Sequence, residues 1–140
     1  MKAVYYSENG GPEVMAYSDR PEPELGEHDV LVRVEAISIE GGDLLNRLIA
    51  PPATIPFIPG YQAGGVVDAV GRRVTRFTPG QRVVAFNWNG SHAELMAAPE
   101  DFCFPIPDGL DMMLASAAPI ACGTAHDALI EYGQLGAGDR

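Results

Sequence analysis

Short apolar runs separated by turn residues fill most of the chain. The clearest run covers residues 29–39, where apolar side chains occupy the even positions from 30 to 36, and Arg33 and Glu35 lie between them. This period of two is typical of a strand with one buried face. Similar short runs predict further strands at 4–7, 14–18, 63–70, 82–86 and 91–98. Many short strands with frequent Gly and Pro turns favour a mainly β fold, a barrel or a sandwich.

Two glycine positions refine this prediction. Gly64 and Gly65 stand inside the strand at 63–70, where glycine indicates a bulge or a close backbone approach. Thr78-Pro79-Gly80-Gln81 fits a type II turn, with proline second and glycine third.

Helical patterns occur at two places. Asp43 is suited to cap the N-terminus of a short helix over 44–49, ahead of Pro51, and pairs by charge with Arg47 four residues later. From residue 111 onward, the apolar spacing predicts two short helices, one near 112–118 and one over 124–132. We therefore expect a β-barrel domain over residues 1–110 and a helical connector over 111–140.

Composition narrows the partners. The chain holds 9 Lys and Arg against 19 Asp and Glu, a formal charge of −10, which argues against nucleic acid and against anionic membrane surfaces. The longest uncharged stretch, 112–125, is shorter than the ~20 residues of a membrane span, and no signal peptide is visible. We expect a cytoplasmic protein without membrane partners. Cys103 and Cys122 both lie among apolar residues, so we expect both to be buried.

An ordered set of motifs resembles one known family. The motifs are Ala36–Asp43, Ile58–Val67, Phe77–Val83, Ser91–Glu94 and Ile120–Ala125. Together they resemble the N-terminal catalytic domain of medium-chain dehydrogenases/reductases. The resemblance implies a GroES-like, partly open β-barrel with short α-helices. It also implies a doubly wound nucleotide-binding domain that would begin after residue 140 and is absent from this sequence.

The motifs also differ from those of zinc alcohol dehydrogenases. Those enzymes carry a ligand Cys in the segment that here is 38–43, and His and Glu where this chain has Tyr61 and Gln62. Tyr and Gln are poor zinc ligands, and the four-cysteine zinc lobe expected near 87–92 is missing. The chain therefore resembles the zinc-free quinone oxidoreductase branch. That branch implies direct hydride transfer from NADPH or NADH to a quinone or an enone, without zinc.

The resemblance nominates Tyr61 as the catalytic residue. Its position implies proximity to the reacting carbon, where the phenol could donate a hydrogen bond to the acceptor oxygen; the alternative is a half-buried packing tyrosine. Asn87 and Trp88 are candidates for substrate binding at the mouth of the cleft, where Trp88 could stack on a planar quinone or simply cover the barrel end.

Three further residues are candidates for cofactor binding. Glu40 stands where relatives often carry Asn facing the nicotinamide, although a solvated loop carboxylate is the alternative. Asp43 could order the cofactor pocket, but capping a helix would by itself explain it. Thr124 resembles the family threonine near the nicotinamide and could also cap a helix. Gly136 and Gly138 form only a G-x-G, more typical of a turn than of a phosphate site.

A second class of function stays open at this point. A GroES-like barrel could be a binding or assembly module, like the co-chaperonins of the same architecture. Residues 111–140 discriminate between the two, because a co-chaperonin would not need them. Their apolar residues also predict self-association into a homo-oligomer. We expect the 140 residues alone to be folded but inactive.

Overall fold

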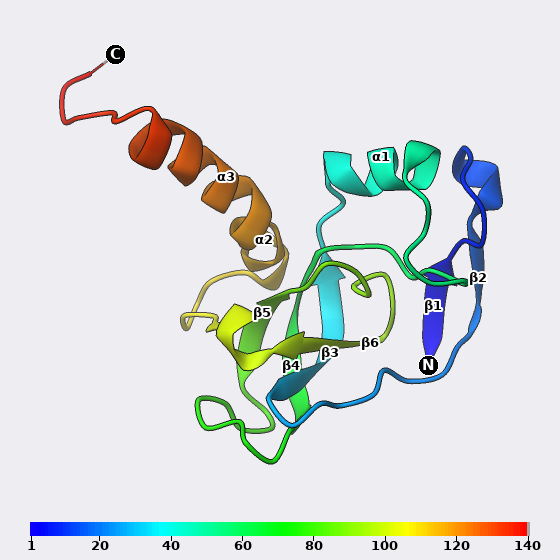
Figure 1. Cartoon of the computed structure of the whole chain (residues 1–140). Coiled ribbons are helices and arrows are strands. Elements are labelled where there is room, and N and C mark those ends of the chain that lie inside the picture. Colours follow the sequence, from blue (N-terminus) through cyan, green and yellow to red (C-terminus); the bar gives the residue numbers. More distant parts are fainter. Residues whose placement is uncertain (140) are drawn as a thin grey trace.

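An antiparallel sheet of five strands forms the centre of the molecule (Figure 1). The computed structural model describes residues 1–139. The strands follow the order β6-β3-β4-β5-β7, and their bounds are β3 Asp29–Ile37, β4 Gln62–Val70, β5 Arg82–Phe86, β6 Leu95–Pro99 and β7 Cys103–Pro105. The predicted mainly β fold is confirmed.

The larger of two core clusters lies on one face of this sheet. A smaller cluster of Val84, Ile106 and Ala115 lies on the other face, where the C-terminal helix begins. Val30 and Val32 of β3 are fully buried, and Leu31 between them is 8% exposed. From Arg33 onward the burial of β3 alternates, with Arg33 and Glu35 exposed, so this part of the strand has an inner and an outer face. The larger cluster comprises Val30, Val32, Val67, Phe77, Val83, Ala85, Ala98 and Cys103.

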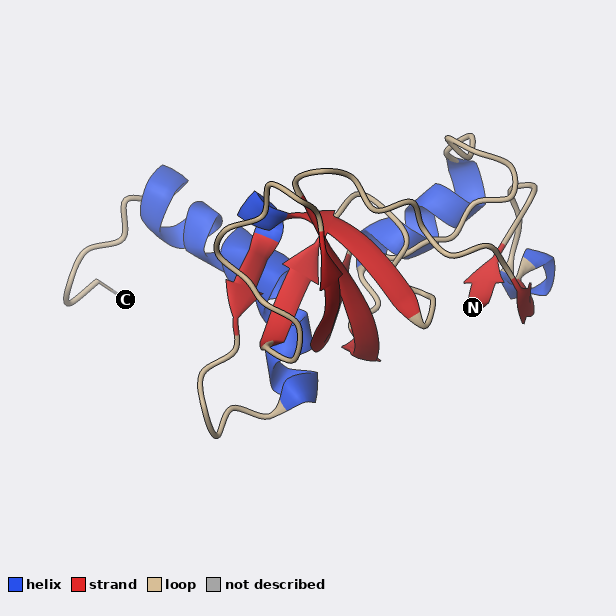
Figure 2. Ribbon diagram, turned by 90° about the horizontal axis from the view of Figure 1, so that it is seen from below, coloured by secondary structure: helices blue, strands red, loops and turns tan. Residues whose placement is uncertain are grey.

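A separate hairpin closes part of the barrel. It consists of β1, Lys2–Tyr5, and β2, Ala16–Asp19, with the short 3-10 turn η1, Pro12–Val14, between them. The N–H of Val4 donates to the carbonyl of His92 at 2.8 Å, and the N–H of Glu94 donates to that of Lys2 at 3.0 Å. These bonds explain why β6 begins at Leu95, because the residues before it pair with β1 instead. Figure 2 shows the strands curled into a half-barrel, as the resemblance implies.

Both glycine predictions are confirmed. A Cβ built on Gly65 would lie 2.1 Å from the carbonyl oxygen of Arg33 on β3, and the β3–β4 register shifts between Val34 and Ala36. Only a residue without a side chain allows the two backbones to approach this closely. Gly80 has a φ of +91° in the turn before β5, a conformation that favours glycine.

The C-terminal helix corrects the sequence prediction. We expected two short helices, but the segment Met112–Tyr132 is one helix of 21 residues. It begins as α2, Met112–Ala117, capped by the Asp111 side chain, and continues through η3, Ala118–Cys122, α3, Gly123–His126, and η4, Asp127–Tyr132. The stretches η3 and η4 are π-helical, and the wider turn at η3 accommodates Pro119 without a break in the helix.

Only the first turns of the C-terminal helix are packed against the sheet. Ala115 and Ser116 are buried, and a Cβ on Gly64 of β4 would lie 2.8 Å from the sulfur of Met112. From Ala121 onward nearly every residue is exposed, and in Figure 1 the helix leads away from the sheet. The predicted turn follows, in which the N–H of Asp139 donates to the carbonyl of Gly136 at 3.2 Å.

Two sequence expectations change at this helix. Cys122 is exposed, whereas Cys103 is buried as predicted, because Cys122 lies beyond the part of the helix that the sheet covers. By length and composition alone, the helix is also long and apolar enough to cross a membrane. Only 11% of its most apolar 18 residues are buried. The apolar part of the helix is therefore longer than the uncharged stretch 112–125 indicated. Length and composition do not test membrane insertion, so the expectation of no membrane partner stays a prediction.

Candidate active site

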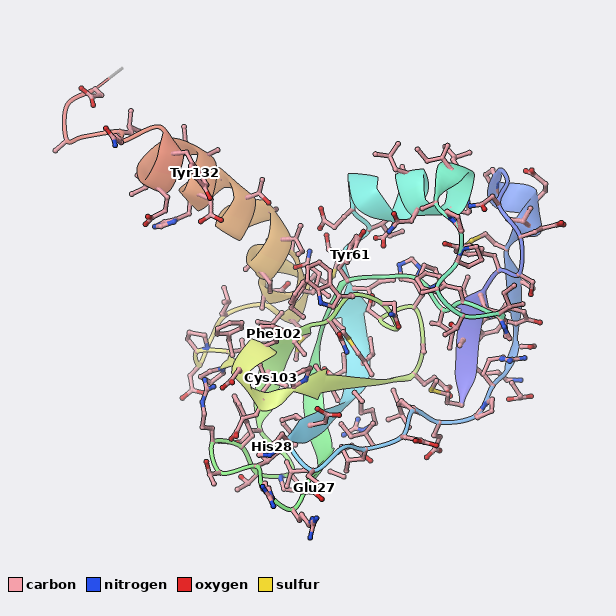
Figure 3. All side chains as sticks on the ribbon, in the orientation of Figure 1. Glu27, His28, Tyr61, Phe102, Cys103 and Tyr132 are labelled. Carbon is pink, nitrogen blue, oxygen red and sulfur yellow. The ribbon has the colours of Figure 1, made fainter. Side chains whose placement is uncertain are left out.

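A pocket of about 430 Å³ lies between the start of helix α1, Gly41–Ile49, the end of β5 and the C-terminal helix. Its lining consists of Glu40, Gly41, Gly42, Tyr61, Phe86, Trp88 and Ile120. Figure 3 labels Tyr61, whose side chain lies between α1 and the C-terminal helix, above the sheet. The pocket therefore has walls from four separate parts of the sequence.

Helix α1, Gly41–Ile49, begins earlier than predicted. Its N-cap is Glu40 and not Asp43, which occupies the third helical position. The carboxylate of Asp43 accepts the backbone N–H of Glu40 at 2.9 Å and satisfies one free donor of the first turn. Asp43 is 6% exposed; it supports the pocket wall from behind and is not part of the lining. The predicted charge pair with Arg47 does not form, since Arg47 Nε donates to the carbonyl of Gly10.

Tyr61 is held by two neighbours on α1. Asn46 donates an N–H from Nδ2 to the phenol oxygen at 2.7 Å. A Cβ on Gly42 would lie 2.8 Å from the Tyr61 ring, so glycine at this position lets the ring pack against the helix. The phenol oxygen accepts from Asn46, and its own O–H proton remains for another acceptor.

Glu40 is tied to the opposite wall through a residue that the sequence interpretation did not nominate. Glu40 Oε1 accepts hydrogen bonds from Ser38 Oγ at 2.8 Å and from Gln62 Nε2 at 2.5 Å. The same Gln62 side chain, which is fully buried, accepts the backbone N–H of Ile120 at 2.9 Å. Gln62 therefore joins the two sides of the pocket. Its position after Tyr61 was visible in the sequence, but its two partners lie 22 and 58 residues away.

Aromatic rings form the outer wall. The rings of Phe86 and Trp88 meet edge to face at 5.4 Å, and Phe86 also contacts Phe102 at 5.5 Å. Trp88 is 69% exposed, which leaves most of its ring for a ligand at the mouth of the pocket.

Asn87 and Thr124 lie outside this pocket. The Asn87 amide donates to the carbonyl of Ala97 at 2.9 Å and accepts from the N–H of Trp88 at 2.8 Å, and Asn87 lines a separate cavity of about 340 Å³. Thr124 lies inside the C-terminal helix and is exposed, so the predicted N-cap role is wrong. Of the six nominated residues, the pocket brings together Glu40, Tyr61 and Trp88, with Asp43 behind them.

Residues 1–139 contain no group of three or more His, Cys, Asp or Glu side chains that could hold a metal ion. His92 is half-buried and lines neighbouring cavities, not this pocket. Burial lowers the pKa of its imidazole against an opposing effect of the Asp43 carboxylate. The pocket chemistry therefore comes from a carboxylate, a phenol and aromatic rings.

The structure thus combines a curled antiparallel half-barrel with a pocket at one end and a helix that leaves beside the pocket. The sequence matches the alcohol dehydrogenase GroES-like domain over residues 26–108, more than half of the chain, and the chain belongs to that family. The resemblance to the medium-chain dehydrogenase/reductase superfamily is confirmed.

Individual relatives are similar over nearly the whole chain. A quinone oxidoreductase of Lama guanicoe is 33% identical over 99% of this chain and 43% of its own length. A synaptic vesicle membrane protein VAT-1 homolog-like of Mus musculus is 33% identical over 96% of this chain and 33% of its own length. The structure of mycobacterial Rv1454c complexed with NADPH superimposes with a TM-score of 0.92 at 34% identity, over 99% of this chain and 44% of the other. The chain thus spans less than half the length of these relatives.

Proposed function

We propose that this chain forms the substrate-side wall of an NAD(P)H-dependent oxidoreductase that reduces quinones or enones by direct hydride transfer without zinc. The observation that carries the proposal is the Tyr61 phenol, which lines the pocket and receives a hydrogen bond from Asn46. A relative is named quinone oxidoreductase and a solved relative is complexed with NADPH, and both names support this class.

The hydrogen bond from Asn46 orients the phenol. Because the Tyr61 oxygen accepts at 2.7 Å, its O–H proton points away from Asn46. A carbonyl oxygen in the pocket could receive that proton as negative charge develops on it. Quinones and enones delocalise such charge themselves, so one neutral donor can replace the Lewis acid that a metal ion would supply.

The pocket residues fit a nicotinamide ring. About 430 Å³ lies in the range of small-molecule sites, and the flat faces of Tyr61, Phe86 and Trp88 suit a planar heterocycle. When bound, the cofactor supplies the hydride. The residues of this chain exclude water, position the two rings and offer the Tyr61 proton. The pyrophosphate would need a helix N-terminus of a second domain, and we therefore expect the 140 residues alone to show no turnover of NADPH with quinone.

Ligand binding tests the proposal directly. Trp88 is the single tryptophan of the chain, so its fluorescence reports occupancy of the pocket. We expect 1,4-naphthoquinone to quench it saturably, and Tyr61→Phe to weaken binding about fivefold to tenfold through the loss of one hydrogen bond. Tyr17→Phe, which removes an exposed hydroxyl on β2, is the matched control and should bind as the unchanged chain does.

Metal content provides a second measurement. We expect elemental analysis of the purified chain to find no stoichiometric zinc after mild chelation. About one zinc per chain would contradict the zinc-free mechanism. No quenching by naphthoquinone would contradict the oxidoreductase proposal and favour a binding or assembly module.

A further inference from the structure

The pocket carries one fixed negative charge and no basic residue. Among its lining residues Glu40 is the only carboxylate, and neither Lys, Arg nor His belongs to the lining. The side chain is fixed because Oε1 accepts from both Ser38 and Gln62. In the capping box of α1 the Glu40 side chain also accepts the backbone N–H of Asp43, which holds the carboxylate further in place at the pocket wall. A positive charge in the pocket would meet this carboxylate without competition from a protein cation.

The aromatic rings of the pocket also favour a positively charged ligand. Tyr61, Phe86 and Trp88 surround the space beside Glu40, and the faces of aromatic rings carry partial negative charge. Cations over such faces are attracted, most strongly over tryptophan. Three rings and one carboxylate are the components that proteins use to hold cations with quaternary nitrogen.

We infer that the pocket is selective for charge, and that it binds a positively charged N-alkylpyridinium ring, the oxidised nicotinamide, more tightly than the neutral reduced ring. The inference rests on the proposed function and goes beyond it by naming Glu40 as the residue that makes the distinction.

The selectivity would favour hydride donation. In the proposed reaction the C–H bond at the donor carbon breaks and its electron pair forms the new C–H bond on the acceptor. The donor ring is left positively charged, and the acceptor oxygen takes a proton from Tyr61, which solvent replaces. Glu40 lines the pocket in which the new positive charge arises, so its attraction is greater after the transfer than before it.

Calorimetry with a matched ligand pair tests the inference. The cation 1-methylnicotinamide and its neutral 1,4-dihydro form share every heavy atom and differ in charge. We expect the cation to bind the 140-residue chain at least tenfold more tightly. Glu40→Gln retains an oxygen that can accept from Ser38 and Gln62, and we expect it to reduce this ratio to near one. Glu22→Gln removes the same charge from an exposed loop and should preserve the ratio.

Each other outcome separates the two proposals. Equal binding of both forms would overturn the charge selectivity and leave the proposed function standing if naphthoquinone still binds. A ratio that persists in Glu40→Gln would overturn the role of Glu40 and assign the preference to the rings. If N-methylquinolinium binds more tightly than 1-methylnicotinamide, the cation that the pocket selects is a substrate and not the cofactor. Failure of all these ligands and of naphthoquinone to bind would overturn both proposals.

Discussion

The sheet and the C-terminal helix differ in how far they bury their apolar side chains. Strands β3, β4 and β5 bury Val32, Val67 and Val83 to 2% exposure or less, whereas Leu129 and Tyr132 on the helix are 52% and 84% exposed. The sheet buries these apolar side chains against other parts of the 140 residues. Over most of its length, the helix leaves its apolar side chains exposed. An exposed apolar face of this kind is typical of a surface that packs against another domain or another subunit.

The pocket lies where these two regions join. Gln62 is the first residue of β4, and its side chain accepts the backbone N–H of Ile120 in the helix. The same side chain donates to Glu40, so one residue ties the helix to the sheet and holds Glu40. The geometry of the pocket therefore depends on the junction more than on either region alone.

The largest expected effect is in the sheet. Gly65→Ala should lower the free energy of unfolding by about 3 kcal/mol, because the new methyl group meets the Arg33 carbonyl of the neighbouring strand. Urea unfolding followed by circular dichroism measures the loss. Gly41→Ala is the control, since a Cβ there meets nothing within 4 Å, and its stability should be unchanged or slightly raised. Equal stability of both variants would mean that β3 and β4 are not packed so tightly.

A smaller effect is expected at the junction. Gln62→Ala should cost about 2 kcal/mol, because it leaves the buried N–H of Ile120 without its partner and frees Glu40. The same urea experiment measures it. Gln81→Ala removes an exposed amide that accepts one hydrogen bond, from the Thr78 N–H, and should cost about 1 kcal/mol or less because that N–H can turn to water. If Gln62→Ala cost no more than that, the tether would not contribute to stability and the helix would be held by packing alone.

The smallest effect on folding is expected on the exposed helix. We predict that the chain self-associates through this surface, and that Leu129→Glu raises the dissociation constant about tenfold in sedimentation experiments over a range of concentrations. The free energy of unfolding of the monomer should change by no more than about 0.5 kcal/mol. Tyr17→Glu places the same charge on an exposed apolar residue of β2 and should leave association unchanged. A strictly monomeric unchanged chain would contradict this prediction.

The sheet could be predicted because its signals are local. The alternation around Arg33, the Gly64-Gly65 pair and the turn at Gly80 each determine structure within a few residues. Strand β7 and the true start of β6 were missed because both depend on pairing with distant segments, β5 and β1. The continuous helix was missed because Pro119 normally ends a helix, and here a wider turn accommodates it.

The site was predictable only where a resemblance supplied positions. Tyr61, Glu40 and Trp88 line one pocket, and their roles in it stay a prediction. The Asn87 amide donates to the backbone of β6 instead. Nothing in the spacing of the sequence indicates that Gln62 joins Glu40 to Ile120. That contact exists only after the helix has folded back onto β4.

The two cysteines differ in reactivity by their placement. Burial raises the pKa of the Cys103 thiol to about 12, so this sulfur stays protonated and chemically inert in the folded chain. Cys122 is exposed on the C-terminal helix, two residues beyond Ile120 of the pocket wall. An alkylating dye would therefore attach at one position, beside the junction of sheet and helix. The native sequence thus contains a single addressable thiol and a single tryptophan, a ready donor and acceptor pair for following motion of the helix against the pocket mouth.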